Sequence, residues 1–308
     1  MAKGSKKVVL AALGANVAVT AAKLGVGLVT GSAAMLAEAA HSAADTVNQI
    51  FLLVSINLSD EPADEDHPFG HGKERFFWAF LAAVFIFVAG AVFSIYTGIH
   101  KLIEGGHHEG SFWPSYVVLA FAFVFDGAVL VISFREAQAR AKQLGIGPLN
   151  FLRETPDVTL KTAMYEEVAA TTGVVLAVIG LALVQITGNA LYDGLASILI
   201  GIVLVLVAIM LGNEARGLLL GAAASRRTRT AIRAAIAEFP EVNAVVTLLT
   251  MQLGLDSVLV TGEINLEDNL TTDEIENLLQ RMTVRIRELA PSVKNVYLEP
   301  HRARRPAD

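Results

Sequence analysis

The residues best suited to chemistry in this 308-residue sequence are ionisable side chains inside long apolar stretches. His41 and Asp45 are four residues apart, which places an imidazole and a carboxylate on one face of a helix. Glu38 and Asn48 fall on the same face. One nitrogen ligand and one hard oxygen ligand suit Zn²⁺ or a similar first-row divalent cation. The pattern therefore predicts a metal site within this stretch.

A later apolar stretch carries Glu166 and Glu167, two acidic residues deep within it. Two helices that supply two ligands each would form a four-coordinate site near the middle of a membrane. The predicted intramembrane site therefore comprises His41, Asp45, Glu166 and Glu167. The alternative is that His41 and Asp45 only hydrogen-bond to neighbouring helices. The cost of ionisable groups in hydrocarbon favours a functional ion site over that alternative.

A second cluster, Asp64, His67 and His71, lies in a polar segment after the first of these stretches. Its two histidines are four residues apart, and the acid comes three residues before the first, so all three can converge on one metal ion. Further acidic residues in the segment would attract cations. The glycines at Gly70 and Gly72 favour a tight turn. The alternative is a solvated polar loop with no ligand.

Membrane-spanning helices must position the intramembrane site. A crossing needs about 20 mostly apolar residues, and six stretches qualify: 8–29, 33–58, 76–103, 113–134, 159–186 and 190–211. The composition agrees, because only 18% of residues are charged, whereas soluble domains carry about a quarter. We therefore expect residues 1–220 to form an all-α transmembrane bundle of six helices in a lipid bilayer.

Composition also excludes several classes of protein. The sequence has no cysteine, which excludes thiolate metal ligands, cysteine nucleophiles and a disulfide scaffold. Its net charge of −6 offers no basic footprint for nucleic acid. We expect neither a nucleic-acid partner nor a small organic substrate.

The lysines and arginines of the short loops indicate the orientation. Ten lie on the amino-terminal side of the predicted crossings, against Lys101 alone on the other: Lys3, Lys6, Lys7, Lys73, Arg75, Arg135, Arg140, Lys142, Arg153 and Lys161. Six crossings place both termini on that side, which the charge excess predicts to be cytoplasmic. We expect Lys23, in the first crossing, to extend to the opposite interface. Asp126 could relay protons, whereas Asp193, near a helix start, is expected to form structural hydrogen bonds.

Residues 225–300 predict a small cytosolic α+β domain, followed by a tail at 301–308. The pattern is helix, strand, strand, helix, strand (αββαβ), which suggests a ferredoxin-like arrangement with the helices on one face of the sheet. Thr271 and Glu274 form a capping box that opens the second helix. Because so small a core is only marginally stable, we expect this regulatory domain to dimerise with a second copy.

Taken together, these features resemble the cation diffusion facilitator family over about residues 8–300. The resemblance rests on the six crossings, the αββαβ domain and three motifs: His41-Ser-Ala-Ala-Asp45, His67-Pro-Phe-Gly-His-Gly-Lys-Glu-Arg75 and Leu191-Tyr-Asp-Gly-Leu-Ala-Ser197. It implies a homodimer that exports a divalent metal, usually Zn²⁺, from the cytosol in exchange for protons. It also implies a transport site between the second and fifth crossings, and a loop site at Asp64, His67 and His71.

The fifth crossing departs from the family pattern, in which His-x-x-x-Asp is common. Alignment on Gly173 places Glu167 at the aspartate and Ala163 at the histidine, so Glu166 becomes the candidate substitute ligand. The resemblance thus predicts an integral membrane antiporter, in the inner or plasma membrane, for Zn²⁺ or for Mn²⁺, Fe²⁺ or Co²⁺, with protons as counter-ion. The alternatives are a passive metal channel, a membrane metal sensor or, less favoured because no His-Glu-x-x-His pattern occurs, an intramembrane metallohydrolase.

Overall fold

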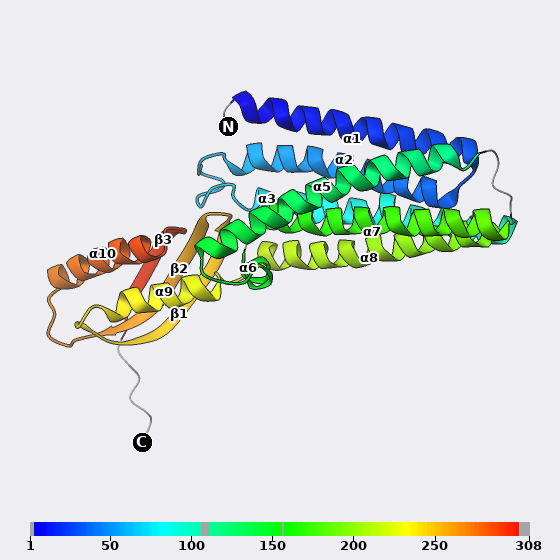
Figure 1. The fold of residues 1–308 in the computed structure, drawn as a ribbon. Helices are drawn as coiled ribbons and strands as arrows, with labels where there is room; N and C mark the ends of the chain where they lie inside the picture. Colours follow the sequence, from blue (N-terminus) through cyan, green and yellow to red (C-terminus); the bar gives the residue numbers. More distant parts are fainter. Residues whose placement is uncertain (1–2, 106–110, 156, 302–308) are drawn as a thin grey trace, which may run out of the picture. The chain divides into compact units, whose positions relative to one another are not determined.

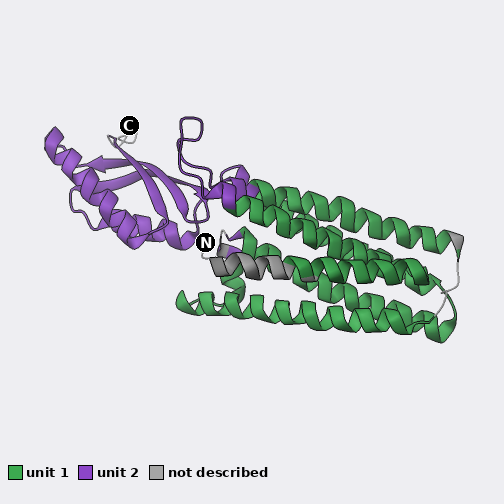
Figure 2. Ribbon diagram, turned by 90° about the horizontal axis from the view of Figure 1, so that it is seen from above, with its two compact units in different colours: residues 1–56, 77–152, 158–215 green, residues 57–76, 153–157, 216–308 purple. Residues whose placement is uncertain are grey.

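The protein forms two compact units in a computed structural model that describes residues 3–105, 111–155 and 157–301 (Figure 1). Unit 1 comprises residues 1–56, 77–152 and 158–215, and unit 2 comprises residues 57–76, 153–157 and 216–308 (Figure 2). The predicted tail at 301–308 lies outside the described residues from 302 onward.

Unit 1 is a bundle of long helices that run side by side (Figure 1). The helices of the amino-terminal 220 residues are α1 (Lys3–Thr30), α2 (Ala33–Ser59), α3 (Glu74–Phe85), the π-helix η1 (Ile86–Val92), α4 (Phe93–Glu104), α5 (Trp113–Gln143), α6 (Pro148–Glu154), α7 (Val158–Thr187) and α8 (Leu191–Leu219). The elements α3, η1 and α4 follow one another without a break. The Gly31–Ser32 turn between α1 and α2 marks one end of the bundle, which we call the turn end.

Four helical segments among the described residues are long and apolar enough to cross a membrane: Glu74–Ile103, Trp113–Gln143, Val158–Thr187 and Leu191–Leu219. Large apolar side chains such as Phe121, Ile186 and Leu206 remain exposed on them, as expected for surfaces in contact with lipid. Among the residues whose side chains are described, α1 contributes the shorter apolar segment Asn16–Thr30. The chain is therefore an integral membrane protein.

Helix α5 continues beyond the predicted crossing 113–134, as far as Gln143. The continuation is polar but keeps helical pairing, since Glu136 and Arg140 form an ion pair one turn apart. The short helix α6, which the sequence reading did not anticipate, follows it. Phe151 of α6 packs against Ala137, Ala141 and Leu160, so an apolar contact fixes this connection.

Glycines bring α4 and α8 into close contact. A Cβ atom on Gly98 would lie 2.7 Å from the backbone oxygen of Gly194, so a side chain cannot be accommodated there without movement of the backbone. Hydrogen bonds add to the contact: the Ser197 hydroxyl donates to the Ser94 carbonyl at 2.7 Å. Small residues and hydroxyl groups of this kind are the usual means of joining helices in lipid.

Unit 2 is built around a three-stranded sheet in the order β1-β2-β3. Its elements are α9 (Arg226–Ala237), β1 (Val242–Gly254), β2 (Ser257–Leu266), α10 (Thr272–Leu289) and β3 (Val293–Pro300). Strands β1 and β2 pair antiparallel across a short turn, and β2 and β3 are parallel neighbours joined by α10. The αββαβ order is as predicted, whereas the three-stranded sheet does not confirm the finer ferredoxin-like assignment.

Both helices of this sheet pack on the same core. Val260 and Ile264 alternate inward along β2 and meet Ile236 of α9 and Met282 of α10, all fully buried. The predicted capping box is present: the Thr271 hydroxyl accepts from the Glu274 amide, and Glu274 Oε2 accepts from the Thr271 amide at 2.8 Å. These bonds lower the pKa of Glu274 below its ordinary value of 4.5.

We predict that Gly98→Ala destabilises the bundle by about 1–3 kcal/mol, the usual cost of overpacking. Gly127→Ala is the matched control, because nothing lies within 4 Å of a Cβ atom at Gly127. Thermal unfolding of the purified protein in detergent measures both variants. Equal midpoints for the two would contradict the close α4–α8 contact.

We predict that the first turn of α10 loses protection as the pH falls below 4.5, through the lowered pKa of Glu274. The sign follows from linkage: a carboxyl whose pKa is lower in the folded state stabilises the fold above its unfolded pKa, and protonation removes that contribution. Hydrogen exchange, corrected for its intrinsic pH dependence, measures the effect. Glu274→Gln should abolish this pH dependence, whereas Glu276→Gln, exposed on the same helix, should retain it.

Candidate functional site

A cavity of about 130 Å³ lies within unit 1 between α1, α2, α5 and α7. Three of the four predicted intramembrane ligands line it: Asp45 from α2, and Glu166 and Glu167 from α7. Asp126 of α5 is a fourth acidic residue in the lining. The remaining lining side chains are Asn16, Val19, Ser42, Gln49, Phe125, Val129 and Ala170. The structure thus gathers carboxylates from three helices around one space.

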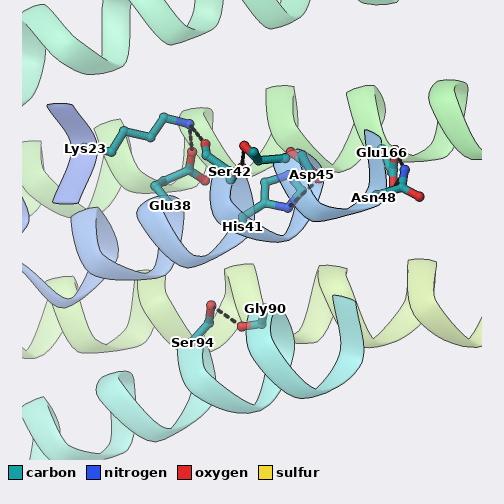
Figure 3. A network of polar contacts seen from close by, with 10 residues as sticks. Lys23, Glu38, His41, Ser42, Asp45, Asn48, Gly90, Ser94 and Glu166 are labelled. Carbon is teal, nitrogen blue, oxygen red and sulfur yellow. Dashed lines mark hydrogen bonds and ion pairs between the residues drawn. The ribbon is translucent and has the colours of Figure 1, made fainter. Parts of the chain in front are cut away.

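The fourth predicted ligand, His41, lies beside Asp45 one helical turn away (Figure 3). Its Nδ1 is 3.6 Å from Asp45 Oδ1, which is too long for a hydrogen bond. The imidazole is buried, and neither ring nitrogen has a hydrogen-bond partner among the described residues. His41 is not among the side chains that line the cavity, so the structure joins it to Asp45 but not directly to the two glutamates.

Glu166 is already engaged by a protein partner. The side-chain amide of Asn48 on α2 donates to its carboxylate, with Nδ2 2.7 Å from both Oε1 and Oε2 (Figure 3). The contact ties α2 to α7 next to the cavity. Adjacent helical residues point about 100° apart, so Asn48 holds the carboxylate of Glu166 while Glu167 points in a different direction from the same helix.

Several polar atoms around the cavity lack partners. Within the described part of the chain, Asp45 Oδ1, Asp126 Oδ2 and Gln49 Oε1 are buried and accept no hydrogen bond. Buried polar atoms in native proteins are nearly always paired. Unpaired carboxylate oxygens next to an unpaired imidazole form a donor set that fits a first-row divalent cation. The four predicted ligands do not converge within a single coordination sphere in this conformation.

Ala163 stands one turn before Glu167, where the family resemblance predicts a histidine, and Glu166 of the same helix lines the cavity as the candidate substitute ligand. In addition, Asp126 adds a carboxylate from α5. We predicted Asp126 only as a proton relay, on the basis of an isolated acid within an apolar stretch. Gln49, one turn beyond Asp45, was not identified at all.

Lys23 contradicts the expectation that it reaches the membrane interface. Only 1% of its side chain is exposed, and its Nζ lies 2.9 Å from Glu38 Oε2 and 2.8 Å from Ser42 Oγ (Figure 3). The prediction was wrong because α2 offers an acid and a hydroxyl within reach of α1. Pairing with them compensates the charge inside the bundle.

Asp193 forms the structural hydrogen bonds expected of it, although not to its own helix. Its carboxylate accepts from the Ser32 hydroxyl at 2.7 Å and from the Ala33 and Ala34 amides at 2.6 and 3.2 Å. The start of α8 therefore caps the start of α2. An acid at a helix amino terminus also interacts favourably with the helix dipole.

The loop cluster converges as its spacing predicts. One ligand atom from each of Asp64, His67 and His71 lies within 4.8 Å of the other two. His67 Nδ1 is 3.3 Å from Asp64 Oδ1, and His71 Nε2 is 3.5 Å from Asp64 Oδ2. The His67 backbone amide donates to Asp64, which lowers the pKa of that carboxyl. The three side chains are therefore close enough together to be candidate ligands of one divalent cation.

Local contacts fix the backbone conformation around the loop cluster. His71 Nδ1 lies 3.2 Å from the Pro62 carbonyl, so donation there leaves Nε2 facing Asp64. Gly70 has φ +82°, a conformation that favours glycine. A Cβ atom on Gly72 would lie 2.7 Å from the Leu253 carbonyl of β1, so glycine is required for this close approach within unit 2.

Comparison with known proteins places these features in context. Residues 9–220 match the family described as the cation efflux transmembrane domain. The human mitochondrial proton-coupled zinc antiporter SLC30A9 is 31% identical over 270 residues, which is 88% of this chain and 47% of that protein. Metal tolerance protein C4 of Arabidopsis thaliana is 33% identical over 71% of this chain and 48% of its own length. The chain thus spans about half the length of these curated relatives.

Shorter matches include the manganese efflux system protein MneP of Bacillus subtilis, which is 41% identical over 101 residues, 33% of this chain and 34% of that protein. Among solved structures, a nickel form of the MamM CTD aligns with 24% of this chain and 94% of its own, at 13% identity and a TM-score of 0.23.

We predict that Asp64→Asn weakens Co²⁺ or Zn²⁺ binding to the loop cluster at least about tenfold, because even outer partners of metal ligands contribute 10–100-fold. Asp66→Asn, an exposed acid in the same loop, is the matched control and should bind as the native chain does. Calorimetric titration of the full chain with the metal measures both variants, with Asp45→Asn as a common background. If Asp64→Asn and Asp66→Asn weakened metal binding equally, the loop cluster would not be a specific site and the acids would attract the cation only nonspecifically.

Proposed function

The chain belongs to the cation efflux family, and we propose that it moves Zn²⁺ or a similar first-row divalent cation out of the cytosol in exchange for protons. The observation that carries this proposal is the cavity in unit 1, where acids from α2, α5 and α7 meet beside an unpaired histidine. Ionisable groups within a membrane bundle are costly, and they mark ion pathways. The names of the zinc and manganese relatives agree with this substrate class.

We assign Asp45 and Glu167 as the carboxylate ligands most directly available to the cation, with His41 as the nitrogen ligand. Asp45 has an unpaired oxygen and lines the cavity with Glu167. Glu166 has two possible roles in this site. It becomes a ligand if its hydrogen bonds to Asn48 break, and otherwise it stays bonded to Asn48 and positions α7. A small rotation of α2 would bring His41 to the cavity, since Asp45 is already its neighbour.

Proton coupling follows from competition for the same atoms. A divalent cation binds neutral imidazole and ionised carboxylates, and protons occupy the same lone pairs. Histidine titrates nearest to neutral pH, which makes His41 the preferred proton carrier of the group. In the proposed cycle the cation loads from the cytosol. Protons from the opposite side then displace it after access to the cavity has switched.

The proposed membrane arrangement has six crossings, with α1 and α2 joining the four strongly apolar segments. In this arrangement both termini and unit 2 are cytoplasmic. The excess of lysine and arginine on that side supports the orientation. Lys161 does not contribute to this excess of positive charge at the surface, because its side chain is buried and forms an ion pair with Glu214 of α8.

We further propose that the chain acts as a homodimer and that the loop cluster is a second, cytoplasmic metal site. Unit 2 supports dimerisation because apolar side chains lie on the open face of its sheet. Leu249 of β1 and Tyr297 of β3 flank Thr261 in register, and they are 65% and 57% exposed. A second copy of the chain would cover this face.

We predict that Asp45→Asn reduces metal-driven proton flux at least about tenfold, because the amide keeps the shape but removes an anionic ligand. The assay uses proteoliposomes that contain a pH dye and are challenged in turn with Zn²⁺, Mn²⁺, Co²⁺ and Fe²⁺. Thr46→Val is the matched control, because among the described residues the Thr46 hydroxyl donates only to the Ser42 carbonyl of its own helix.

Full activity in Asp45→Asn would contradict the site assignment. Metal uptake without proton movement by the native chain would indicate a passive channel instead. Equilibrium metal binding without any flux would indicate a sensor.

A further inference from the structure

The buried Lys23–Glu38 ion pair has no part in the proposed ligand set. Its partners are 1% and 0% exposed, and their charged atoms are 2.9 Å apart. Replacing such a buried pair with apolar residues is often neutral or stabilising, so stability alone does not explain it. Ionisable residues within a membrane bundle more often belong to the pathway.

The pair lies next to the cavity, on its side toward the turn end. Ser42, which accepts from Lys23 Nζ at 2.8 Å, lines the cavity. Val19, one turn before Lys23 on α1, lines it as well. Glu38 lies one turn from Ser42 in the direction of the Gly31–Ser32 turn. The ammonium group therefore stands where the polar cavity ends on that side.

Beyond the pair, the first turn of α2 buries only apolar side chains, and at the turn itself Ser32 and Asp193 form a buried hydrogen bond. The residues that α2 buries between Ser32 and Glu38 are Ala33, Ala34, Met35 and Ala37. Ala34 and Met35 belong to one core with Val174, Ala177 and Leu181 of α7. A hydrated cation cannot cross such a layer without separation of the helices.

The pair also connects three helices. Lys23 belongs to α1 and Glu38 to α2, and the Glu38 carboxylate packs directly against α7. A Cβ atom on Gly173 would clash with Glu38 Oε1, so a side chain there would have to displace the carboxylate. That oxygen has no hydrogen-bond partner among the described residues. Among the described residues, Lys23 therefore supplies the positive charge that compensates the Glu38 carboxylate.

From this placement we propose that the Lys23–Glu38 pair is a latch that closes the transport route between the cavity and the turn end. The latch holds α1 and α2 together against α7, and the cation leaves toward the turn end only when the pair separates. The inference rests on the proposed function for its role in transport, whereas closure of the route is a property of the bundle itself.

Thiol accessibility tests the latch without background, because the chain has no cysteine. Val19→Cys places a thiol on the cavity wall, and a membrane-impermeant thiol reagent is applied separately to right-side-out and inside-out vesicles without metal. With the latch intact, labelling from the turn side should be slow. Adding Lys23→Met should speed it about tenfold or more, because removing one partner of a buried pair strongly disfavours the paired arrangement.

The controls separate a local opening from general loosening. Lys161→Met removes another buried, ion-paired lysine of unit 1, and it should leave the labelling rate of Val19→Cys within about twofold, because distant sites act independently. Val17→Cys, on the exposed face of α1, should resist the reagent in lipid. Ser111→Cys, next to the start of α5, identifies the vesicle face that carries the turn end.

An unchanged rate in Lys23→Met would overturn the proposal, as would equal acceleration by Lys161→Met. If Lys23→Met fails to fold, the double variant Lys23→Met/Glu38→Gln decides by the same criterion, because it leaves no unpaired charge. Metal flux is measured in parallel with the native chain, because Val19 lines the cavity and a thiol there could itself bind the metal. If no metal flux occurs but Lys23→Met still speeds the labelling, the proposed function is wrong and the latch stands. If flux is normal but Lys23→Met leaves the labelling rate unchanged, the latch is wrong and the proposed function stands.

Discussion

The cost of an ionised side chain inside an apolar helical bundle governs the arrangement of unit 1. Each such group needs an opposite charge, a hydrogen bond or a bound ion. Lys23 meets this need through Glu38, and Lys161 through Glu214. Asp193 meets it by capping the start of α2. These pairs join α1 to α2, α7 to α8 and α8 to α2, so the same constraint that compensates the charges also sets which helices lie together.

Against this background, the unpaired atoms of the cavity carry functional information. Asp45 and Asp126 each keep a buried oxygen without a partner, and His41 keeps two ring nitrogens. Glu166, in contrast, is held by Asn48. Lys23, Lys161 and Asp193 are compensated by protein partners while these donors are free, which supports the proposed cation site.

Local signals in the sequence predicted local structure well. The capping box of α10 and the loop cluster at Asp64 depend on residues three to seven positions apart, and both are present. Long apolar runs are also local signals, and they predicted α7 and α8. Contacts across the bundle were beyond such signals: Asn48 and Glu166 are 118 positions apart, and Asp193 and Ala33 are 160. Lys23 was misplaced because its position alone cannot show that Glu38 faces it from the next helix.

The central claim is that α2 and α7 together hold the transported cation. An anomalous-difference map from crystals of the full chain grown in lipid with Zn²⁺ tests it most directly. The account predicts a peak in the cavity at about 2.0–2.2 Å from carboxylate oxygens of both Asp45 and Glu167. A map in which the bound zinc appears only outside the cavity, while Asp45 and Glu167 contact protein alone, would contradict it.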